Sequence, residues 1–408
     1  MDRTIFHCDL NSFYASVELL SHPELRDRPV AVCGDPAARH GIVLAKNEPA
    51  KARGVRTAET VWQARRKCPE LVLLPAHHEK YRYYSRLANE IYRRRTDLVE
   101  PFGIDESWLD VTAAVARQGG DPVALADRLR AEMAAELGLT ISVGVSFNKA
   151  FAKLGSDYKK PDATTYISRE NYRDLVWPLP VTDLLFVGRA SGRLLASRGI
   201  LTIGDLAARP RAELVRLLGK NGGQLHDYAT GADQAPVRPA GQTDAPKSVG
   251  CGLTFRRDLQ GEEELRLGAQ LLAERVAMRL RRHELKAGLV QVAIRDPGFR
   301  TIDRRRRTDA PTNTARDLFA CAAAILSACW EPSAPVRALT ITALDLVPEA
   351  TAGEQLTLFA PEAAERRARQ EKLERTMDDL RARYGRDIVS FASGHTETAR
   401  DITGGEET

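Results

Sequence analysis

CDLNSFYASVE, residues 8–18, sets one carboxylate between an apolar run and an amphipathic stretch. The apolar run predicts a strand over residues 4–8, and Asp9 stands where that strand ends. Residues 13–20 have helical spacing and Ser12 is a suitable N-cap, so a helix should follow directly. The segment therefore predicts a strand and a helix joined at a carboxylate.

A second pair of carboxylates lies in IDESWLD, residues 104–110, where a strand pair or bent hairpin is expected. Asp105 and Glu106 have apolar neighbours, so burying them is costly unless a cation compensates them. Consecutive strand residues point to opposite faces, so both can serve one site only if the backbone bends, which Gly103 permits. An isolated Asp-Glu pair is more often a solvated turn, and the residues alone leave both readings open.

Strand and helix patterns alternate as far as residue 158, which predicts a mixed α/β sheet covered by helices. One helix has Asp121 as its N-cap and Pro122 at its first position. The elements expected in this part are helices at 78–95, 122–137 and 148–158, and a strand at 140–146.

The second half of the chain has a different pattern. Short helices and glycine turns fill residues 181–233, and a linker follows at 236–246. From residue 348 the core pattern ends; the residues from Gly394 are polar and are expected to be disordered. The remaining elements expected are strands at 250–255, 289–295 and 338–347, and helices at 262–283, 313–329 and 363–384.

Composition excludes several classes of protein. The six cysteines are scattered without a C-x-x-C pair, which indicates reduced thiols and neither a disulfide framework nor a zinc site. No run approaches the roughly 18–20 apolar residues of a membrane span. The apolar run at the N-terminus is too short for a signal peptide. We therefore expect a cytoplasmic protein with no membrane partner.

Positive charge gathers in one segment. Residues 247–307 hold 15 Lys and Arg against 8 Asp and Glu, while the whole chain has a formal net charge of +5. Basic segments of this density favour polyanionic partners, because neutralising phosphates releases counterions. A solvated charged face explains the segment equally well when it stands alone.

Three ordered motifs resemble those of one enzyme family. They are residues 8–18, residues 104–110, and SVGVS at 142–146 followed by Asn148-Lys149, Phe151-Ala152-Lys153 and Lys160-Pro161. Their sequence, order and spacing resemble the catalytic motifs of Y-family DNA polymerases, and most of all the bacterial polymerase IV branch. The resemblance extends from residue 1 to about residue 347.

The resemblance implies a multidomain fold of α/β and α+β type, a right-hand polymerase with palm, fingers and thumb plus a C-terminal α+β little-finger domain. The domains expected are the palm at 1–10 and 78–166, the fingers at 11–77, a thumb with a helix-hairpin-helix at 167–235, the linker at 236–246, the little finger at 247–348, and a tail with a clamp-binding peptide at 349–408.

The resemblance also implies template-directed DNA synthesis of the translesion, low-fidelity type. In this reaction deoxynucleoside triphosphates extend the primer of a primer–template DNA. Asp105 and Glu106 become the catalytic residues, and with Asp9 and the backbone carbonyl of Leu10 they become ligands of two Mg²⁺ ions, for which Mn²⁺ could substitute. Gly103 replaces the serine that is usual in the family.

Substrate contacts follow from the same resemblance. Tyr14 takes the position of a steric gate that excludes a ribose 2′-hydroxyl, with Phe13 beside it. Lys160 resembles a lysine that reaches the triphosphate. Residues 47–53 depart from the family, because Glu48 and Lys51 stand where a tyrosine and an arginine normally meet the triphosphate.

DNA contacts are expected at two helix-hairpin-helix segments, near Gly188 and Gly222, although Phe186 replaces the first expected glycine. The arginines expected to track phosphates in the little finger are Arg295, Arg304, Arg305, Arg306 and Arg307. A monomer is expected.

QLTLF, residues 355–359, resembles the peptide with which bacterial polymerases bind the sliding clamp, the beta subunit. The anchors would be Gln355, Leu356, Leu358 and Phe359. A short strand packed on the second domain is the alternative.

Three other functions compete. A catalytically silent relative would not need all three carboxylates and Tyr14. A nucleotide cyclase also uses carboxylates on a palm-like sheet, but no Gly-Gly-Asp-Glu-Phe motif is present. A DNA-binding protein without catalysis leaves Asp105 and Glu106 unexplained. Primer extension with and without Mg²⁺ separates these functions.

Overall fold

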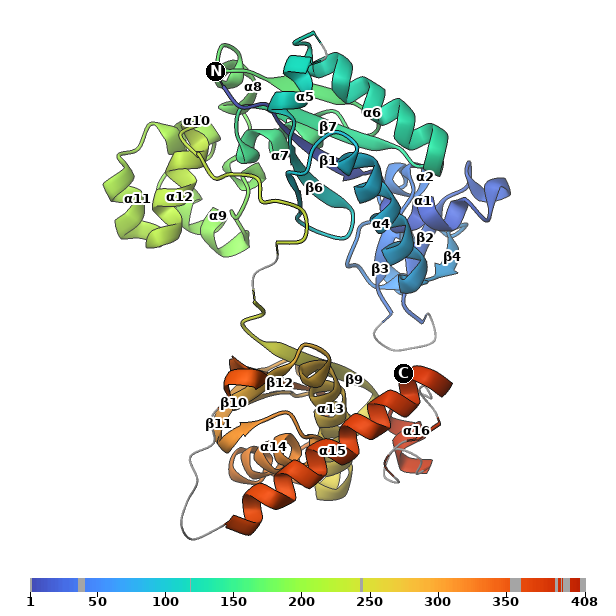
Figure 1. The fold of residues 1–408 in the computed structure, drawn as a ribbon. Helices are drawn as coiled ribbons and strands as arrows, with labels where there is room; N and C mark the ends of the chain where they lie inside the picture. Colours follow the sequence, from blue (N-terminus) through green and yellow to red (C-terminus); the bar gives the residue numbers. More distant parts are fainter. Residues whose placement is uncertain are drawn as a thin grey trace. The chain divides into compact units, whose positions relative to one another are not determined.

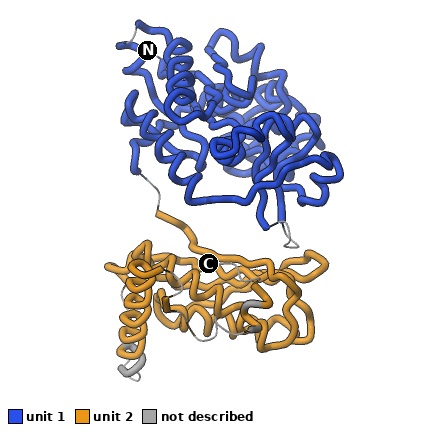
Figure 2. Tube along the Cα trace, turned by 90° about the vertical axis from the view of Figure 1, so that its right-hand side faces the viewer, with its two compact units in different colours: residues 1–243 blue, residues 244–408 orange. Residues whose placement is uncertain are grey.

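The computed structural model describes residues 2–35, 41–117, 119–242, 245–352, 361–385, 388–389, 391 and 397–403. The chain divides into two units, Met1–Thr243 and Asp244–Thr408 (Figures 1 and 2). Each unit has its own sheet and its own hydrophobic core.

The first unit is built on a five-stranded sheet with strand order β5-β6-β1-β7-β8 (Figure 1). The central strand, β1, runs antiparallel to both of its neighbours, while β7 and β8 are parallel. All six residues of β1 are buried, so both faces of the sheet are covered. The strands are β1 (Ile5–Leu10), β5 (Val99–Pro101), β6 (Glu106–Asp110), β7 (Ile141–Ser146) and β8 (Thr164–Ile167).

Side chains alternate along β1 between two environments. Phe6, Cys8 and Leu10 join the core formed with α1 (Phe13–Leu19), α4 (His78–Arg93) and α6 (Pro122–Leu137). The other set, which includes Asp9, faces α7 (Lys149–Tyr158). Cys8 thus points away from Asp9, as the alternation of a strand requires. The strand continues to Leu10, two residues beyond its predicted end.

The helix α7 lies unusually close to the sheet. A β-carbon added to Gly144 of β7 would lie 1.8 Å from the carbonyl oxygen of Ala152. A β-carbon added to Gly155 of α7 would lie 3.0 Å from the Cα of Gly144. Only glycine fits this approach. It brings the residues of α7 next to the end of β1.

A smaller sheet of order β3-β2-β4 follows α1 and has its own core, and an all-helical segment follows β8. The remaining elements of this unit are η1 (Pro23–Leu25), β2 (Val30–Cys33), β3 (Val43–Lys46), α2 (Glu48–Ala52), α3 (Val61–Lys67), β4 (Val72–Pro75), α5 (Thr112–Arg117), α8 (Tyr172–Val176), η2 (Val181–Asp183), α9 (Arg189–Ala196), α10 (Ile203–Ala207), α11 (Arg211–Leu218) and α12 (Lys220–Ala229).

The predicted linker is anchored at its start. Val237 is 3% exposed and packs with Ile5 and Trp108. The backbone N–H of Arg238 donates to Glu100 Oε2 at 2.9 Å, and the Arg238 side chain reaches Glu100 Oε1 at 3.2 Å. Two residues further on, the Ala240 N–H donates to the Asp97 carbonyl at 2.9 Å. The first five residues of the expected linker, 236–240, therefore include backbone and side chains that are fixed to the first unit.

Glu100 is itself fixed to the sheet. The Lys149 ammonium, 2.7 Å from Glu100 Oε2, lies over the ring of Trp108 at 4.4 Å, and the Trp108 indole N–H donates to the Lys149 carbonyl at 3.0 Å. The linker is thus joined to the start of α7 and to β6 through one buried carboxylate.

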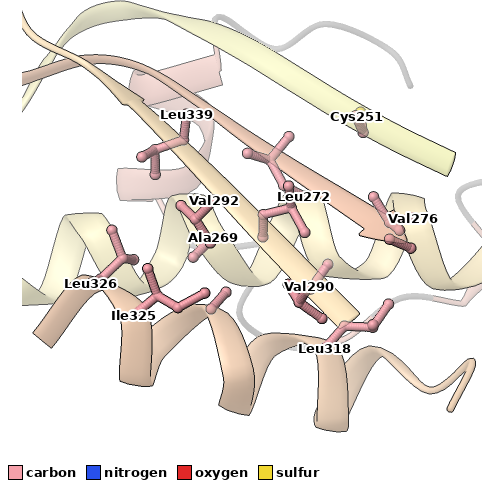
Figure 3. Close-up of a cluster of buried hydrophobic side chains, with 14 of the residues drawn as sticks. Cys251, Ala269, Leu272, Val276, Val290, Val292, Leu318, Ile325, Leu326 and Leu339 are labelled. Atoms are coloured by element: carbon pink, nitrogen blue, oxygen red, sulfur yellow. The ribbon is translucent and has the colours of Figure 1, made fainter. Parts of the chain in front are cut away.

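The second unit is a four-stranded antiparallel sheet of order β11-β10-β12-β9, covered on one face by two helices. Figure 3 shows Val290 and Val292 of the sheet in one apolar cluster with Leu272 of one helix and Leu318 of the other. The first strand ends four residues later than predicted, and the second begins four residues earlier. The elements are β9 (Val249–Leu259), α13 (Gly261–Arg282), β10 (Leu285–Arg295), β11 (Thr301–Thr312), α14 (Ala315–Cys329), β12 (Val336–Pro348) and η3 (Glu349–Thr351).

Two further helices, α15 (Pro361–Tyr384) and α16 (Glu397–Thr403), belong to this unit. Glu374 of α15 is buried, pairs with the Arg281 guanidinium and accepts the Ala315 N–H at 2.9 Å. Ile402 of α16 is fully buried in the core of the sheet domain. The expected disorder after Gly394 is therefore wrong for α16, because Ile402 supplies an apolar anchor. The predicted clamp peptide, residues 355–359, lies outside the described residues.

Across the described residues no helix has the length and apolarity needed to cross a membrane.

Candidate active site

Two carboxylates, Asp9 and Glu106, meet at one end of the central sheet, and Asp105 follows in the adjoining bend. Asp9 and Glu106 are directly opposite in the antiparallel pair of β1 and β6. Asp105 precedes β6 in a bend that is closed by the Phe102 N–H donating to the Glu106 carbonyl at 2.9 Å. The Leu10 N–H donates to the Asp105 carbonyl at 3.0 Å. The predicted bent hairpin is confirmed.

Gly103 has a simple steric role in this bend. A β-carbon there would lie 3.4 Å from Asp105 Oδ1, which is an ordinary van der Waals contact. Replacement of the family's serine by glycine therefore leaves open space beside the Asp105 carboxylate.

Two lysines neutralise the carboxylates. Lys153 of α7 lies 3.3 Å from Asp9 Oδ2 and 3.2 Å from Glu106 Oε1. Lys160, just after α7, lies 2.6 Å from Asp9 Oδ2. Asp157 joins both lysines, at 3.0 Å from Lys153 and 2.7 Å from Lys160. The buried charges of Asp9 and Glu106 are tolerated here because each has a lysine partner.

The pKa values of the carboxylates move in different directions. Burial raises the pKa of Asp9, against the charges of Lys160 and Lys153. Burial and the charge of Glu106 raise the pKa of Asp105. Burial alone would raise the pKa of Glu106 too, but the neighbouring His7 imidazole and the charge of Lys153 lower it. Such opposed shifts are common where carboxylates share a site.

His7 is a member of the cluster that sequence reasoning missed. It is fully buried, two residues before Asp9 on the same face of β1. Its Nε2 lies 3.3 Å from Glu106 Oε2. Ligand atoms of His7, Asp9 and Glu106 all lie within 4.8 Å of one another. Period-two alternation from Asp9 was the signal that could have found it.

Lys153 and Asp157 were also overlooked as site residues. They are one helical turn apart on α7, so both reach the same side. Asp157 and Lys153 precede Lys160 by three and seven residues, which is helical spacing. That spacing would have placed them on the same side as Lys160 and therefore near Asp9.

Tyr14 lies beside the carboxylates. Burial and the nearby charge of Asp105 raise the pKa of Tyr14. Its ring is stacked on Tyr81, and that of His78 meets it edge-on with centroids 5.9 Å apart. Phe13 is buried, and its ring contacts that of Tyr14 at a tilt, with centroids 5.7 Å apart, so it supports Tyr14 and exposes little surface of its own.

The departures in residues 47–53 have a local explanation. Glu48 begins α2 after the N-cap Asn47, whose side chain accepts the Ala50 N–H. Glu48 turns along the helix to Lys51, 3.4 Å away, and both side chains are about half exposed. The carboxylate is thus paired within α2, and the Lys51 ammonium stays at the surface.

The two predicted hairpin glycines differ in role. Gly188 is the N-cap of α9 and has open space around it. Gly222 lies inside α12, where a β-carbon would be 1.9 Å from the Leu214 carbonyl oxygen, and its N–H donates to Gly219. Gly222 therefore serves the packing of α12 against α11. Of the two glycines, only Gly188 has the open surroundings that the predicted phosphate contact needs.

Phe186, in place of the expected glycine, adopts a left-handed conformation with φ of 69°. Its ring lies 6.5 Å from that of Phe102 in the bend before Asp105 and 6.3 Å from that of Tyr228, measured between centroids. Such a conformation costs a non-glycine residue about 1 kcal/mol or more. Aromatic contacts between the helical segment and the bend offset that cost.

The four consecutive arginines divide between the two faces of the sheet in the second unit. Arg304 and Arg306 pair in register with the core residues Val292 and Val290, so they point to the helix-covered side. The open face carries the other set. Arg305 donates to Gln291 Oε1 at 2.7 Å, Arg295 donates to Thr301 at 3.1 Å, and Arg307 lies 3.5 Å from Asp345.

Contacts with α14 agree with this division. Burial raises the pKa of the Cys321 thiol, and the charge of Arg306 opposes it. Burial also raises the pKa of the Cys329 thiol, and the charge of Arg304 opposes that rise. The prediction treated all four arginines as one patch, but alternation along β11 separates them.

Comparison with known proteins covers both units. The impB/mucB/samB family matches residues 8–157, and the C-terminal domain of that family matches residues 246–358. DNA polymerase IV of Acetivibrio thermocellus is 46% identical over 385 residues, which are 94% of this chain and 96% of the relative. DNA polymerase IV 1 of Bacillus subtilis is 40% identical over 387 residues, 95% of this chain and 92% of the relative.

A solved Y-family DNA polymerase chimera, 20% identical in sequence, superimposes with a TM-score of 0.74 over 84% of this chain and 99% of its own. At this identity the likeness supports the fold, and it confirms the predicted right-hand polymerase with a C-terminal little finger. The two relatives are similar enough in sequence, over nearly the whole chain, to show the family as well as the fold. The chain therefore belongs to the DNA polymerase IV branch of the Y family, the DNA-directed DNA polymerases of translesion synthesis.

Proposed function

We propose that this polymerase adds deoxynucleotides to a primer 3′-hydroxyl by two-metal catalysis at Asp9, Asp105 and Glu106. One observation carries the proposal: Asp9 and Glu106 are in register at the end of the central sheet, with Asp105 in the adjoining bend. Carboxylates placed this way fit two hard divalent cations.

The residues fit Mg²⁺, with Mn²⁺ as a substitute. The donor set is three carboxylates, which the Leu10 backbone carbonyl would complete, and Glu106 Oε2 has no hydrogen-bond partner in the described structure. When bound, the ions lower the pKa of the attacking hydroxyl and neutralise charge on the leaving group. Lys153 and Lys160 neutralise the same carboxylates from α7.

Other residues hold the nucleotide. Lys160 would bind the triphosphate, because its ammonium already lies in an anion cluster next to Asp9. Lys51 would meet the triphosphate from α2, and Tyr14 would exclude the ribose 2′-hydroxyl. Phe13 supports the Tyr14 ring through a tilted ring contact.

Primer–template DNA would be held in each unit by groups that read no sequence. Gly188 offers an open backbone at the start of α9. In the second unit, Arg295 and Arg305 present guanidinium groups on the open face of the sheet. Such contacts track phosphates and suit an enzyme that must accept any template.

Recruitment by the sliding clamp through residues 355–359 rests on sequence alone, since these residues are outside the described structure. A monomer acting in the cytoplasm fits this role.

Primer extension with and without Mg²⁺ tests the catalytic proposal. Asp105→Ala and Glu106→Ala should each lower extension on the order of 10³-fold or more, while the dissociation constant for DNA stays at the wild-type value. Glu90→Ala, which removes an exposed carboxylate on α4, is the matched control. Normal extension by either active-site variant would refute the assignment.

A further inference from the structure

We propose that Asn11 is a positioning residue for Lys160, because its amide group ties the loop that carries this lysine to the strand that carries Asp9. The inference rests on the role proposed above for Lys160 in binding the triphosphate. It assigns a function to a side chain that lies inside the first motif but was given none there.

Asn11 leaves the sheet from a fixed point. It directly follows β1, two residues after Asp9, and only 7% of it is exposed. Its backbone N–H donates to the Thr140 carbonyl at 2.9 Å, and its carbonyl accepts the Ser16 hydroxyl at 2.7 Å. The backbone of Asn11 is therefore held on both sides before its side chain makes any contact.

The side-chain amide joins two other segments of the chain. Nδ2 donates to Ser142 Oγ of β7 at 2.8 Å, and Oδ1 accepts the Asp162 N–H at 2.9 Å. A backbone N–H can only donate, so the amide oxygen must be the atom that faces Asp162. Ser142 is in register with Asp9 in the pairing of β1 and β7. It thus fixes the amide from within the sheet, and the amide in turn holds the loop.

The loop in question is residues 159–163, between α7 and β8. Its Lys160 ammonium lies 2.6 Å from Asp9 Oδ2, and two residues later Asp162 is bound by Asn11. Asp9 and Asn11 are also two residues apart along the chain. The hydrogen bond from Asp162 to Asn11 therefore sets how far the loop stands from the end of β1, and with it where the ammonium group lies.

Asp162 has a backbone conformation that needs support, with a left-handed φ of 50°. Arg130 of α6 contacts its carboxylate, with Nη2 2.9 Å from Oδ1. That carboxylate is 48% exposed, and water weakens an ion pair of this kind. The bond to Asn11 is made on the buried side of the loop, where water does not compete, so it is the stronger constraint on the backbone.

A role in folding alone is the alternative, since buried polar groups are usually paired. The two roles differ in what they predict about Lys160. If Asn11 only stabilises the fold, its loss has the same effect whether or not the lysine is present. If Asn11 positions the lysine, its loss weakens nucleotide binding only while the lysine is there to be displaced.

Asn11→Leu tests the first step, because it nearly keeps the volume of the side chain and removes both hydrogen bonds. The dissociation constant for the incoming nucleotide, measured with Mg²⁺ on a primer that ends in a dideoxynucleotide, should rise about 3–10-fold. In single-turnover extension, the rate at saturating nucleotide should fall less than this, since the three carboxylates keep their places. The dissociation constant for DNA should not change.

Asn171→Ala is the matched control. Asn171 also uses both ends of its amide, accepting the Ser168 N–H at 2.8 Å and donating to the Tyr166 carbonyl at 3.2 Å, but it does so in the turn that follows β8. Its loss removes a comparable pair of hydrogen bonds from the same unit and should leave the nucleotide dissociation constant at the wild-type value.

Lys160→Ala supplies the second step. Alone it should raise the nucleotide dissociation constant about 10-fold or more, because a charge-assisted contact with phosphate is lost. In the Lys160→Ala background, Asn11→Leu should add almost nothing, since two changes that act through one contact are not additive. If Asn11→Leu does not fold, Asn11→Ala takes its place, because it removes the same bonds without an apolar branch beside Ser142.

The outcomes separate this inference from the proposed function. A wild-type nucleotide dissociation constant in the Asn11 variant, with a raised one in Lys160→Ala, would overturn the role of Asn11 alone. Additive losses in the double variant, accompanied by a lower melting temperature, would also overturn it and leave Asn11 a structural residue. An unchanged constant in Lys160→Ala would refute the triphosphate role of the lysine and the inference with it, while Asp105→Ala still tests the metal site independently.

Discussion

The phenol ring of Tyr14 is stacked on that of Tyr81, with centroids 4.0 Å apart and planes 12° apart. Tyr81 is fully buried and donates its hydroxyl to Glu18 Oε1 at 2.6 Å. Tyr14 therefore rests on a residue that is held at both its ring and its hydroxyl. A ring supported in this way can resist the approach of an additional hydroxyl group.

Replacement of Tyr14 by Ala should admit ribonucleotides, because the 2′-hydroxyl then no longer meets a ring. Single-turnover incorporation of matched ribo- and deoxyribonucleotides measures the discrimination. Tyr83→Ala, which removes an exposed ring from α4, serves as the control. Unchanged discrimination in Tyr14→Ala would remove Tyr14 from this role.

Two double variants of equal charge test the division of the arginines. Arg295→Ala with Arg305→Ala removes two cations from the open face, and Arg304→Ala with Arg306→Ala removes two from the helix side. Removing one cation that binds a phosphate should lower the salt dependence of log Kd by about 0.9, so the slope should fall by about 2 in the first variant and by much less in the second. Fluorescence anisotropy with primer–template DNA over a range of salt gives both slopes. Equal changes in slope would mean that the whole of β11 contacts DNA.

Leu358→Ala with Phe359→Ala tests the clamp peptide. Peptide anchors concentrate binding energy in few side chains, so each change should cost about 1–3 kcal/mol of affinity for the sliding clamp and remove its stimulation of synthesis. Clamp-free extension and the melting temperature should stay nearly unchanged. A large drop in melting temperature with clamp binding intact would show that these residues are part of a core.

Glu274 of α13 makes stability depend on pH. Burial raises its pKa to about 7, against the charge of Arg381, and Oε1 has no hydrogen-bond partner among the described residues. An acid with a raised folded pKa favours the protonated form, so the wild-type protein loses stability as pH rises from the unfolded value near 4.5 through 7.

Glu274→Gln should therefore melt at a higher temperature than the wild type at pH 8 and at the same temperature at pH 4.5. About 2–4 °C is expected for each kcal/mol in a unit of this size. Glu365→Gln removes an exposed carboxylate from α15 and controls for net charge. A difference that does not change with pH would exclude titration of Glu274 as its cause.

Local signals predicted several elements well. The cap of α6 is formed as expected, because Asp121 accepts the N–H groups of Val123 and Ala124 and Pro122 follows it. The alternation that sends Cys8 away from Asp9 needs only the pleat of a strand. Such features depend on neighbours within a few residues, which a sequence displays directly.

Contacts between distant residues could not be predicted in the same way. Ile402 is an apolar residue in a polar tail. Its side chain is buried because it packs into the core beside the sheet of the second unit, far from it in the sequence. The register that places Arg304 opposite Val292 likewise depends on how β10 and β11 pair. Four adjacent arginines look like one patch until that pairing separates them.

The anchoring of Arg238 and Ala240 near Glu100 limits how far apart the two units can move. Only the residues between Ala240 and Val249, the start of β9, remain to span them. At about 3.6 Å a residue that length cannot exceed roughly 30 Å in any conformation. Once one unit has bound DNA, the other is confined near the same duplex at an effective concentration in the millimolar range. Two separate contacts with DNA can thereby combine into tighter binding, and the anchoring of Arg238 and Ala240 sets the length of the tether.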